Sequence, residues 1–271
     1  MNDKTNYPVS NNRPLTITIF LTTILIASSL SATSLKLKPS INKILKKIDK
    51  QQTIEKDVTA KVTILQQDIE QGIKQMESIY FAKGSTDQFL IVMTAPESEK
   101  GNGYLKADDH FWMYRRNTRT FQHISRDESI AGSDANTSDF ETPKYELQYK
   151  GKKDSDNEDI IQTVNLGKIP AYKIDVSSDL PNVAYPNLTI WVRQDNLLPL
   201  KIQNKSYSNS LISTQYFLKY SKINDKFIAI KQMVIDNFEK GNKTVWEITD
   251  ITFSPIDNHI FTKAYLENLS N

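Results

Sequence analysis

The acidic pair and histidine in "ADDH" are the residues whose types best suit acid–base chemistry. Such chemistry needs its groups to converge in a pocket. Here Asp108 and Asp109 fall between two strand-like segments, where aspartate is favoured for its turn geometry. The three histidines, His110, His123 and His259, lack the short spacing of metal ligands, and in the expected hairpin the first two lie on opposite faces. We interpret "ADDH" as a turn and expect no metal or other cofactor.

Other catalytic signatures are also missing from the sequence. It contains no Gly-x-Ser-x-Gly, phosphate loop or His-Glu-x-x-His pattern. The absence of cysteine excludes disulfides, thiolate metal sites and thiol catalysis. A net charge of +2 is too even for nucleic-acid binding, which needs a concentrated basic face. We therefore expect a protein that is not an enzyme, with an envelope hydrolase acting through the 132–139 loop as the alternative.

The N-terminus has the pattern of a secretory signal. Lys4 and Arg13 precede the uncharged run "LTITIFLTTILIASSL", and small residues follow it. The run is shorter than the ~20 residues of a membrane span. We predict that residues 1–31 are a signal peptide, with an uncleaved anchor as the alternative. Residues 35–271 would then form a single domain in the periplasm.

The segment "PSINKILKKIDKQQTIEK" predicts an amphipathic helix. Ile41, Ile44, Leu45 and Ile48 follow helical spacing and form one apolar stripe. Ser40 stands before the stripe as an N-cap. The lysines on the other faces would suit a membrane surface, but we favour a helix that packs on a sheet and keeps its lysines in water.

From about Val58 onward the apolar pattern has a period of two residues. The segments are short, β-branched or aromatic, and are separated by Gly, Pro, Asp and Asn, which is typical of β-strands. No alternation of strands and helices appears, so a Rossmann-type enzyme fold is not expected. The polar stretch "SRDESIAGSDANTSDFETPKYE" reads as a loop with a helical turn. The buried face of so many strands must be covered, and one strong helix is too small to cover it. This shortage favours a sheet that curves around a cavity closed by the helix.

Two apolar segments would supply the lining of such a cavity. In "QFLIVMTAP", Phe89, Ile91 and Met93 share one strand face, and we expect that face to point inward. Methionine suits flexible ligands because its side chain adapts. Trp112 and Tyr114 are assigned to the cavity as well.

The strand that carries this Trp and Tyr is apolar on both faces. Trp112 and Tyr114 oppose Phe111 and Met113. A turn centred near residue 117 would place Phe121 with the latter pair. Such a strand is either covered by other elements on both sides, or lines a cavity with its inner face and contacts another element with its outer face.

An ordered series of motifs resembles the LolA-like family of periplasmic outer-membrane lipoprotein-sorting proteins. The series runs through "FLIVMTAPESEKGNGYL", "FWMYRRNTRTFQHIS" and "AGSDANTSDF", and later through "LTIWVRQDNLLPLKIQ" and "NKTVWEITDITF". The matching positions are Met93, Pro96, Lys100, Gly101, Leu105, Trp112, Tyr114, Arg119, Ile124, Ser125, Gly132, Ser133, Asp134 and Asp139. Arg116 and Ala135 depart from the family pattern, and these departures concern the loop geometry rather than the fold.

The resemblance implies a mainly β (α+β) fold. We expect a curved, half-open antiparallel β-barrel of about 11 strands, with the N-terminal amphipathic helix and short helices as a lid over an apolar cavity. The protein would be a periplasmic carrier that binds acyl chains of lipoproteins and moves them toward the outer membrane. The residues predicted to bind the acyl chains are Phe89, Ile91, Met93, Leu105, Trp112 and Tyr114.

The resemblance also implies partners. These are acylated lipoproteins or another lipid, an inner-membrane donor complex and an outer-membrane receptor, and no nucleic acid. The cysteine-free N-terminus is similar to a carrier rather than to a membrane-tethered receptor of the same fold. Two alternatives remain open: a carrier or sensor for another amphiphile on the same scaffold, and a membrane-anchored scaffold protein.

Overall fold

The computed structural model describes residues 38–142, 144–181, 183–223, 225–238 and 241–269. Lys38–Asn271 cluster as one compact unit. The predicted signal peptide, residues 1–31, lies outside the described residues. Within the described part of the chain, no helix has the length and apolar character needed to cross a membrane.

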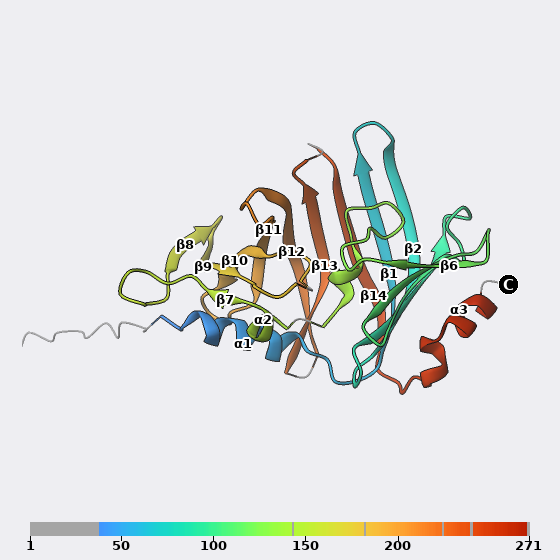
Figure 1. Cartoon of the computed structure of the whole chain (residues 1–271), viewed down its shortest axis with the longest axis horizontal. Helices are drawn as coiled ribbons and strands as arrows, with labels where there is room; N and C mark the ends of the chain where they lie inside the picture. Colours follow the sequence, from blue (N-terminus) through green and yellow to red (C-terminus); the bar gives the residue numbers. More distant parts are fainter. Residues whose placement is uncertain (1–37, 143, 182, 224, 239–240, 270–271) are drawn as a thin grey trace, which may run out of the picture. The chain divides into compact units, whose positions relative to one another are not determined.

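The described unit is built mainly of strands (Figure 1). The strands are β1 (Val58–Asp68), β2 (Gly72–Lys83), β3 (Gln88–Ala95), β4 (Gly103–Ala107), β5 (His110–Arg115), β6 (Thr120–Ile124), β7 (Lys150–Gly151), β8 (Ile161–Leu166), β9 (Ile169–Ser177), β10 (Asn187–Arg193), β11 (Pro199–Lys205), β12 (Leu211–Ile223), β13 (Lys226–Asp236) and β14 (Lys243–Thr252). The helices are α1 (Ile41–Gln52), η1 (Thr137–Phe140), α2 (Tyr145–Gln148), η2 (Asn258–Phe261) and α3 (Lys263–Leu269).

All fourteen strands belong to one antiparallel sheet. Its order is β6-β5-β4-β3-β2-β1-β14-β13-β12-β11-β10-β9-β7, and β8 pairs with β9. The first and last long strands meet at the centre, where Thr63 pairs with Glu247. The sheet is open, because its end strands β6 and β7 do not pair with each other. The predicted mainly β, half-open antiparallel fold is confirmed, with fourteen strands rather than about eleven.

The helix α1 covers one end of the inner face of this sheet. Its stripe of Ile41, Ile44, Leu45 and Ile48 is buried against apolar residues of β9, β10 and β11. Ser40 caps the helix by accepting a hydrogen bond from the Lys43 backbone N–H at 3.2 Å. The predicted helix, its cap and its packing on a sheet are confirmed.

A long segment between β6 and β7 covers the middle of the same face. It carries η1, and the Phe140 ring lies 5.7 Å from that of Tyr80 and 6.5 Å from that of Trp246. The next helix, α2, is joined to α1, since the Asp49 carboxylate accepts hydrogen bonds from the backbone N–H groups of Tyr145 and Glu146 at 2.9 and 2.8 Å. The segment and α1 together form the cover of the inner face.

The C-terminal segment covers the opposite, outer face of β3, β4 and β5. Leu266 of α3 and Phe261 of η2 are buried against Leu90, Leu105 and Tyr114. We did not predict this helix. It explains why these strands are apolar on both faces: the inner face packs under the cover and the outer face packs under α3.

Candidate functional site

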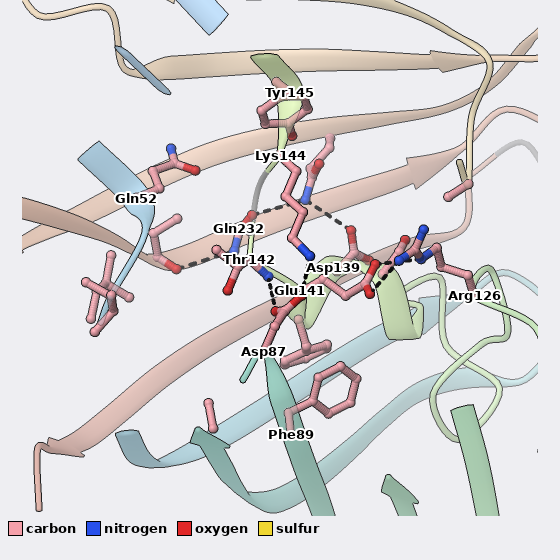
Figure 2. A pocket seen from close by; sticks show the side chains of 18 of the residues that line it. Gln52, Asp87, Phe89, Arg126, Asp139, Glu141, Thr142, Lys144, Tyr145 and Gln232 are labelled. Carbon is pink, nitrogen blue, oxygen red and sulfur yellow. Dashed lines mark hydrogen bonds and ion pairs between the residues drawn. The ribbon is translucent and has the colours of Figure 1, made fainter. Parts of the chain in front are cut away.

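A cavity of about 280 Å³ lies between the inner face of the sheet and its cover. Its wall combines residues from α1, η1 and α2 with residues from strands on both sides of the sheet's centre (Figure 2). Much of this wall is aromatic or aliphatic, including Val58, Tyr80, Phe89, Phe140, Tyr149, Phe217, Phe227 and Ile248. The cavity therefore offers apolar contacts alongside its polar groups.

A polar cluster occupies the part of the wall where η1 faces β12 and β13. The Asp139 carboxylate accepts hydrogen bonds from the Asn136 backbone N–H at 3.0 Å and from Gln215 Nε2 at 3.3 Å. The same Gln215 nitrogen donates to Gln232 Oε1 at 3.1 Å. Asp139 keeps some accessible surface because it lines the cavity, yet it lies deep in the fold. This burial raises the pKa of Asp139 to about 7, and its two hydrogen bonds offset only part of the effect.

Two tyrosines surround this carboxyl group. Burial raises the pKa of Tyr185 to about 12, and the negative charge of Asp139 adds to the shift. The pKa of Tyr145 is also raised, by burial first and by the charges of nearby groups that include Asp139. Both phenols lie within electrostatic range of the carboxyl group and stay neutral at physiological pH.

A charged network forms another part of the wall. Lys106 is only 2% exposed, and its Nζ lies 2.8 Å from Asp87 Oδ2 and 2.7 Å from Glu141 Oε1. Lys144 contacts the same Asp87 oxygen at 2.9 Å, and Arg126 Nε lies 2.7 Å from Glu141 Oε2. Figure 2 shows Lys144 reaching down toward Asp87, above Phe89. The network ties the cover to the sheet.

The pKa of Asp87 is shifted in the opposite direction to that of Asp139. Burial alone would raise its pKa, but the hydrogen bonds and charges of Lys106 and Lys144, with a bond from the Thr142 backbone N–H, lower the pKa to about 2. Asp87 is therefore compensated by cations, and Asp139 is not.

The structure places the six predicted acyl-chain residues on two different faces. Phe89 lines the cavity. Ile91 and Met93 share its face and are buried further along β3, in the core under the 125–142 segment.

The other three predicted residues lie outside the cavity wall. Leu105, Trp112 and Tyr114 are on the outer face, under α3 and η2. The reason is the strand alternation: Leu105 pairs with Trp112 across β4 and β5, so both share the face that α3 covers. Ligand contact by any of the six residues stays a prediction.

The register expected for the hairpin of β5 and β6 is wrong by one position. Phe121 pairs with Tyr114 rather than lying beside Phe111 and Met113, because the turn centres between residues 117 and 118. One residue of slip moves every side chain to the other face.

The histidine assignment fails for the same reason. His110 and His123 share a face, with ring centroids 5.6 Å apart. Within the described ranges, no group of three or more His, Cys, Asp or Glu residues is arranged to hold a metal ion. The interpretation of "ADDH" as a turn is confirmed: Asp108 and Asp109 adopt positive φ angles of 49° and 61° between β4 and β5.

The loop proposed for an alternative hydrolase uses its polar groups to hold itself in place. Ser133 Oγ donates to the Ile130 carbonyl at 2.7 Å. The Asp134 carboxylate accepts from Thr244 Oγ1 at 2.8 Å. Neither side chain lines the cavity. Within this loop, only Ser138 and Asp139 reach the cavity wall.

The glutamines of the polar cluster were missed by the sequence reasoning. Gln215 and Gln232 are buried on the inner faces of their strands, beside Ser213 and Val234 respectively. A usable signal was present for Gln232, because it interrupts the apolar face formed by Ile228, Ile230 and Val234.

Comparisons with known proteins agree with this architecture. A family model whose description is "uncharacterized protein" matches residues 85–268, more than half of the chain. No curated protein sequence matches the chain. A LolA superfamily protein from Nitrosomonas europaea has a TM-score of 0.70 at 18% identity, covering 84% of this chain and 100% of its own. An outer membrane lipoprotein-sorting protein domain from Vibrio parahaemolyticus has a TM-score of 0.70 at 16% identity, with coverages of 83% and 97%.

A third solved structure links the fold to another family name. A DUF1329 family protein from Desulfovibrio piger has a TM-score of 0.71 at 18% identity, covering 83% of this chain and 97% of its own. At these identities the likeness establishes the fold. The chain therefore belongs to the family that the matching model describes, and its fold is the LolA-like fold that the sequence motifs resemble.

Proposed function

We propose that this protein is a non-enzymatic carrier that takes the hydrocarbon chain of a lipid or lipoprotein into the cavity between the sheet and its cover. The observation that carries the proposal is the cavity of about 280 Å³ with Tyr80, Phe89, Phe140 and Phe227 in its wall. Each methylene removed from water is worth ~0.8 kcal/mol, so a chain of ten methylenes gains roughly 8 kcal/mol. Hydrophobic burial is non-directional, so it permits both uptake and release.

The size of the cavity bears on the cargo. Small-molecule sites usually have volumes of roughly 300–1,000 Å³, and about 280 Å³ is just below this range. The volume favours one chain rather than several. We propose an acylated lipoprotein as cargo, with one acyl chain inserted. The polar cluster around Asp139 favours a second candidate, a carrier for another single-chain amphiphile.

The proposed setting is the periplasm. It is supported by the secretory pattern of residues 1–31 and by the fold shared with an outer membrane lipoprotein-sorting protein domain. In this setting the carrier would load at an inner-membrane donor complex and unload at an outer-membrane receptor.

The test is extraction of an acylated protein from membranes. The protein, purified from a bacterium that exports and processes it, is incubated with inner-membrane vesicles that hold an acylated protein and the donor machinery. We expect the acylated protein to appear in the soluble fraction. Ala229→Trp fills the cavity from β13 and should abolish extraction. Leu218→Trp, on the neighbouring β12 and 50% exposed, should not.

Mass spectrometry of the lipid that co-purifies with the protein separates the two cargoes. An acylated peptide supports the lipoprotein carrier, and a free amphiphile supports the second candidate. If the wild type extracts nothing while the vesicles are competent for release, the carrier function is wrong.

A further inference from the structure

The carboxyl group of Asp139 differs from the other acids of the cavity wall in having no cation beside it. Asp87 and Glu141 are each held by two cationic side chains. Within the described part of the chain, the hydrogen-bond partners of Asp139 are the Asn136 backbone N–H and Gln215 Nε2, and both are neutral. A buried carboxylate without a cation is costly, and a ligand that brings a positive charge removes that cost.

Among the carboxyl and amide groups of this cluster, the hydrogen bonds leave acceptor positions unused. Gln215 Nε2 is shared between Asp139 Oδ1 and Gln232 Oε1. Gln232 Nε2 is turned away and donates to the Ala229 carbonyl at 3.3 Å. A carboxylate has about four acceptor positions and only two are used here. The cluster therefore complements a ligand group that donates hydrogen bonds.

Aromatic rings complete the surroundings of this acid. Tyr145 and Tyr185 lie within its electrostatic range, and both line the cavity. The faces of aromatic rings attract cations that lie within ~6 Å of the ring centre. An acid with free acceptor positions and aromatic rings in the same wall favour the same kind of ligand group.

From these features, and resting on the carrier function proposed above, we propose that the cavity selects a single-chain amphiphile with a primary ammonium head group that binds Asp139. The ammonium group has three donors and no acceptor, so it can bond Asp139 and Gln232 Oε1 together. The hydrocarbon chain would extend from there along Phe89 and Phe140. A carboxylate head group would be repelled by Asp139.

The test compares three ligands with the same chain: dodecylammonium, dodecanol and dodecanoate, each below its micelle concentration. Binding to the purified protein is measured by calorimetry at pH 8. A hydrogen bond to a charged group is worth ~1.5–3 kcal/mol, so we expect dodecylammonium to bind about 10- to 100-fold more tightly than dodecanol. Asp139→Asn should remove this advantage. Asp134→Asn is the matched control, because Asp134 belongs to the same loop but bonds Thr244 outside the cavity.

The pH dependence gives a readout that needs no variant. An alkylammonium keeps its charge up to about pH 10, as lysine does. Lowering the pH from 8 to 5 should weaken dodecylammonium binding by about 10-fold or more, and leave dodecanol binding unchanged. The groups facing Asp139 are two amides and the phenols of Tyr145 and Tyr185, none of which titrates in this interval. Asp49, which holds α2, has a pKa of about 6, so Asp139→Asn must abolish the pH effect while Asp49 is still present.

The outcomes separate this inference from the carrier function. Equal affinity for the three ligands, or tighter binding of dodecanoate, overturns the ammonium preference and leaves the carrier function intact. Binding of none of them overturns both. Tighter binding of dodecylammonium that persists in Asp139→Asn with unchanged pH dependence also overturns the assignment to Asp139.

Discussion

Replacement of Asp139 by asparagine should stabilise the protein at alkaline pH. The pKa of Asp139 is raised from 3.8 to about 7, so the folded state binds this proton more tightly than the unfolded state does. The stability of the wild type must therefore fall as pH rises from about 4 through 7. Asparagine resembles the neutral acid in shape and does not ionise, so Asp139→Asn should escape this loss.

The size of the effect follows from the shift. Each pKa unit corresponds to ~1.36 kcal/mol, so a shift of about three units gives an upper limit of about 4 kcal/mol. Water that enters the cavity can reach the carboxylate, and we halve the figure for this screening to about 2 kcal/mol. At pH 8 the free energy of unfolding of Asp139→Asn should exceed that of the wild type by about 2 kcal/mol. At pH 4.5 the difference should be below about 1 kcal/mol.

Urea unfolding followed by tryptophan fluorescence at several pH values measures this difference. Asp49 titrates in a similar interval but is present in both proteins, so its contribution cancels. Asp134→Asn, in the same loop, should retain the pH dependence of the wild type. If Asp139→Asn and the wild type lose stability in parallel between pH 4.5 and 8, the burial assigned to Asp139 is wrong.

Three further predictions concern the walls and the outer face. Lys106→Met should lower the free energy of unfolding by about 3 kcal/mol, because it leaves two carboxylates in the wall without their buried cation. Lys144→Met removes a more exposed ion pair and should lower it by less than about 1 kcal/mol. Urea unfolding measures both losses, and equal losses would contradict the account. The pKa of Asp87 is lowered to about 2, so the stability that its carboxylate contributes is present above pH 4. The free energy of unfolding should fall by about 2 kcal/mol as the pH drops from 4 to 2. Asp87→Asn should lack this acid-dependent loss in the same assay. Leu266→Ala should lower the free energy of unfolding by about 3 kcal/mol. Because Leu266 packs on the outer face, the affinity for dodecanol measured by calorimetry should not change. A loss of affinity would mean that the outer face contributes to the site.

The parts of the fold that could be predicted from the sequence are those with local signals. The helix α1 has its cap, Ser40, and a complete apolar stripe within twelve residues. The turn at Asp108 and Asp109 has residues that tolerate positive φ. The ordered motifs predicted the class of fold before any pairing was known.

The register of the β5–β6 hairpin and the cover of the outer face by α3 could not be predicted in this way. To predict the register of the β5–β6 hairpin, the centre of its turn must be located to within half a residue. An error of that size placed Phe121 and His123 on the wrong face. The outer face of β5 is covered by α3, whose seven residues are too few to show a helical period. Without that cover, Trp112 and Tyr114 looked like lining for a cavity on the inner face.

The polar cluster of the cavity was also beyond local reasoning. Asp139 and Gln215 are 76 positions apart in the sequence, and Gln215 and Gln232 are 17 apart. Only the sheet order brings them together. The two glutamines on buried strand faces were the available hint that this side of the cavity is not purely apolar.

The central claim is that a hydrocarbon chain lies between the sheet and its cover, and Trp246 is placed to report it. Its side chain is 1% exposed, and its ring lies 6.5 Å from that of Phe140 in the cavity wall. Trp112→Phe and Trp191→Phe remove the other two tryptophans of the sequence. A brominated acyl chain, which quenches the fluorescence of a tryptophan close to it, is then titrated into the protein. We predict quenching of Trp246 that saturates at one chain per protein molecule, whereas binding of the chain with no change in Trp246 fluorescence would contradict the account.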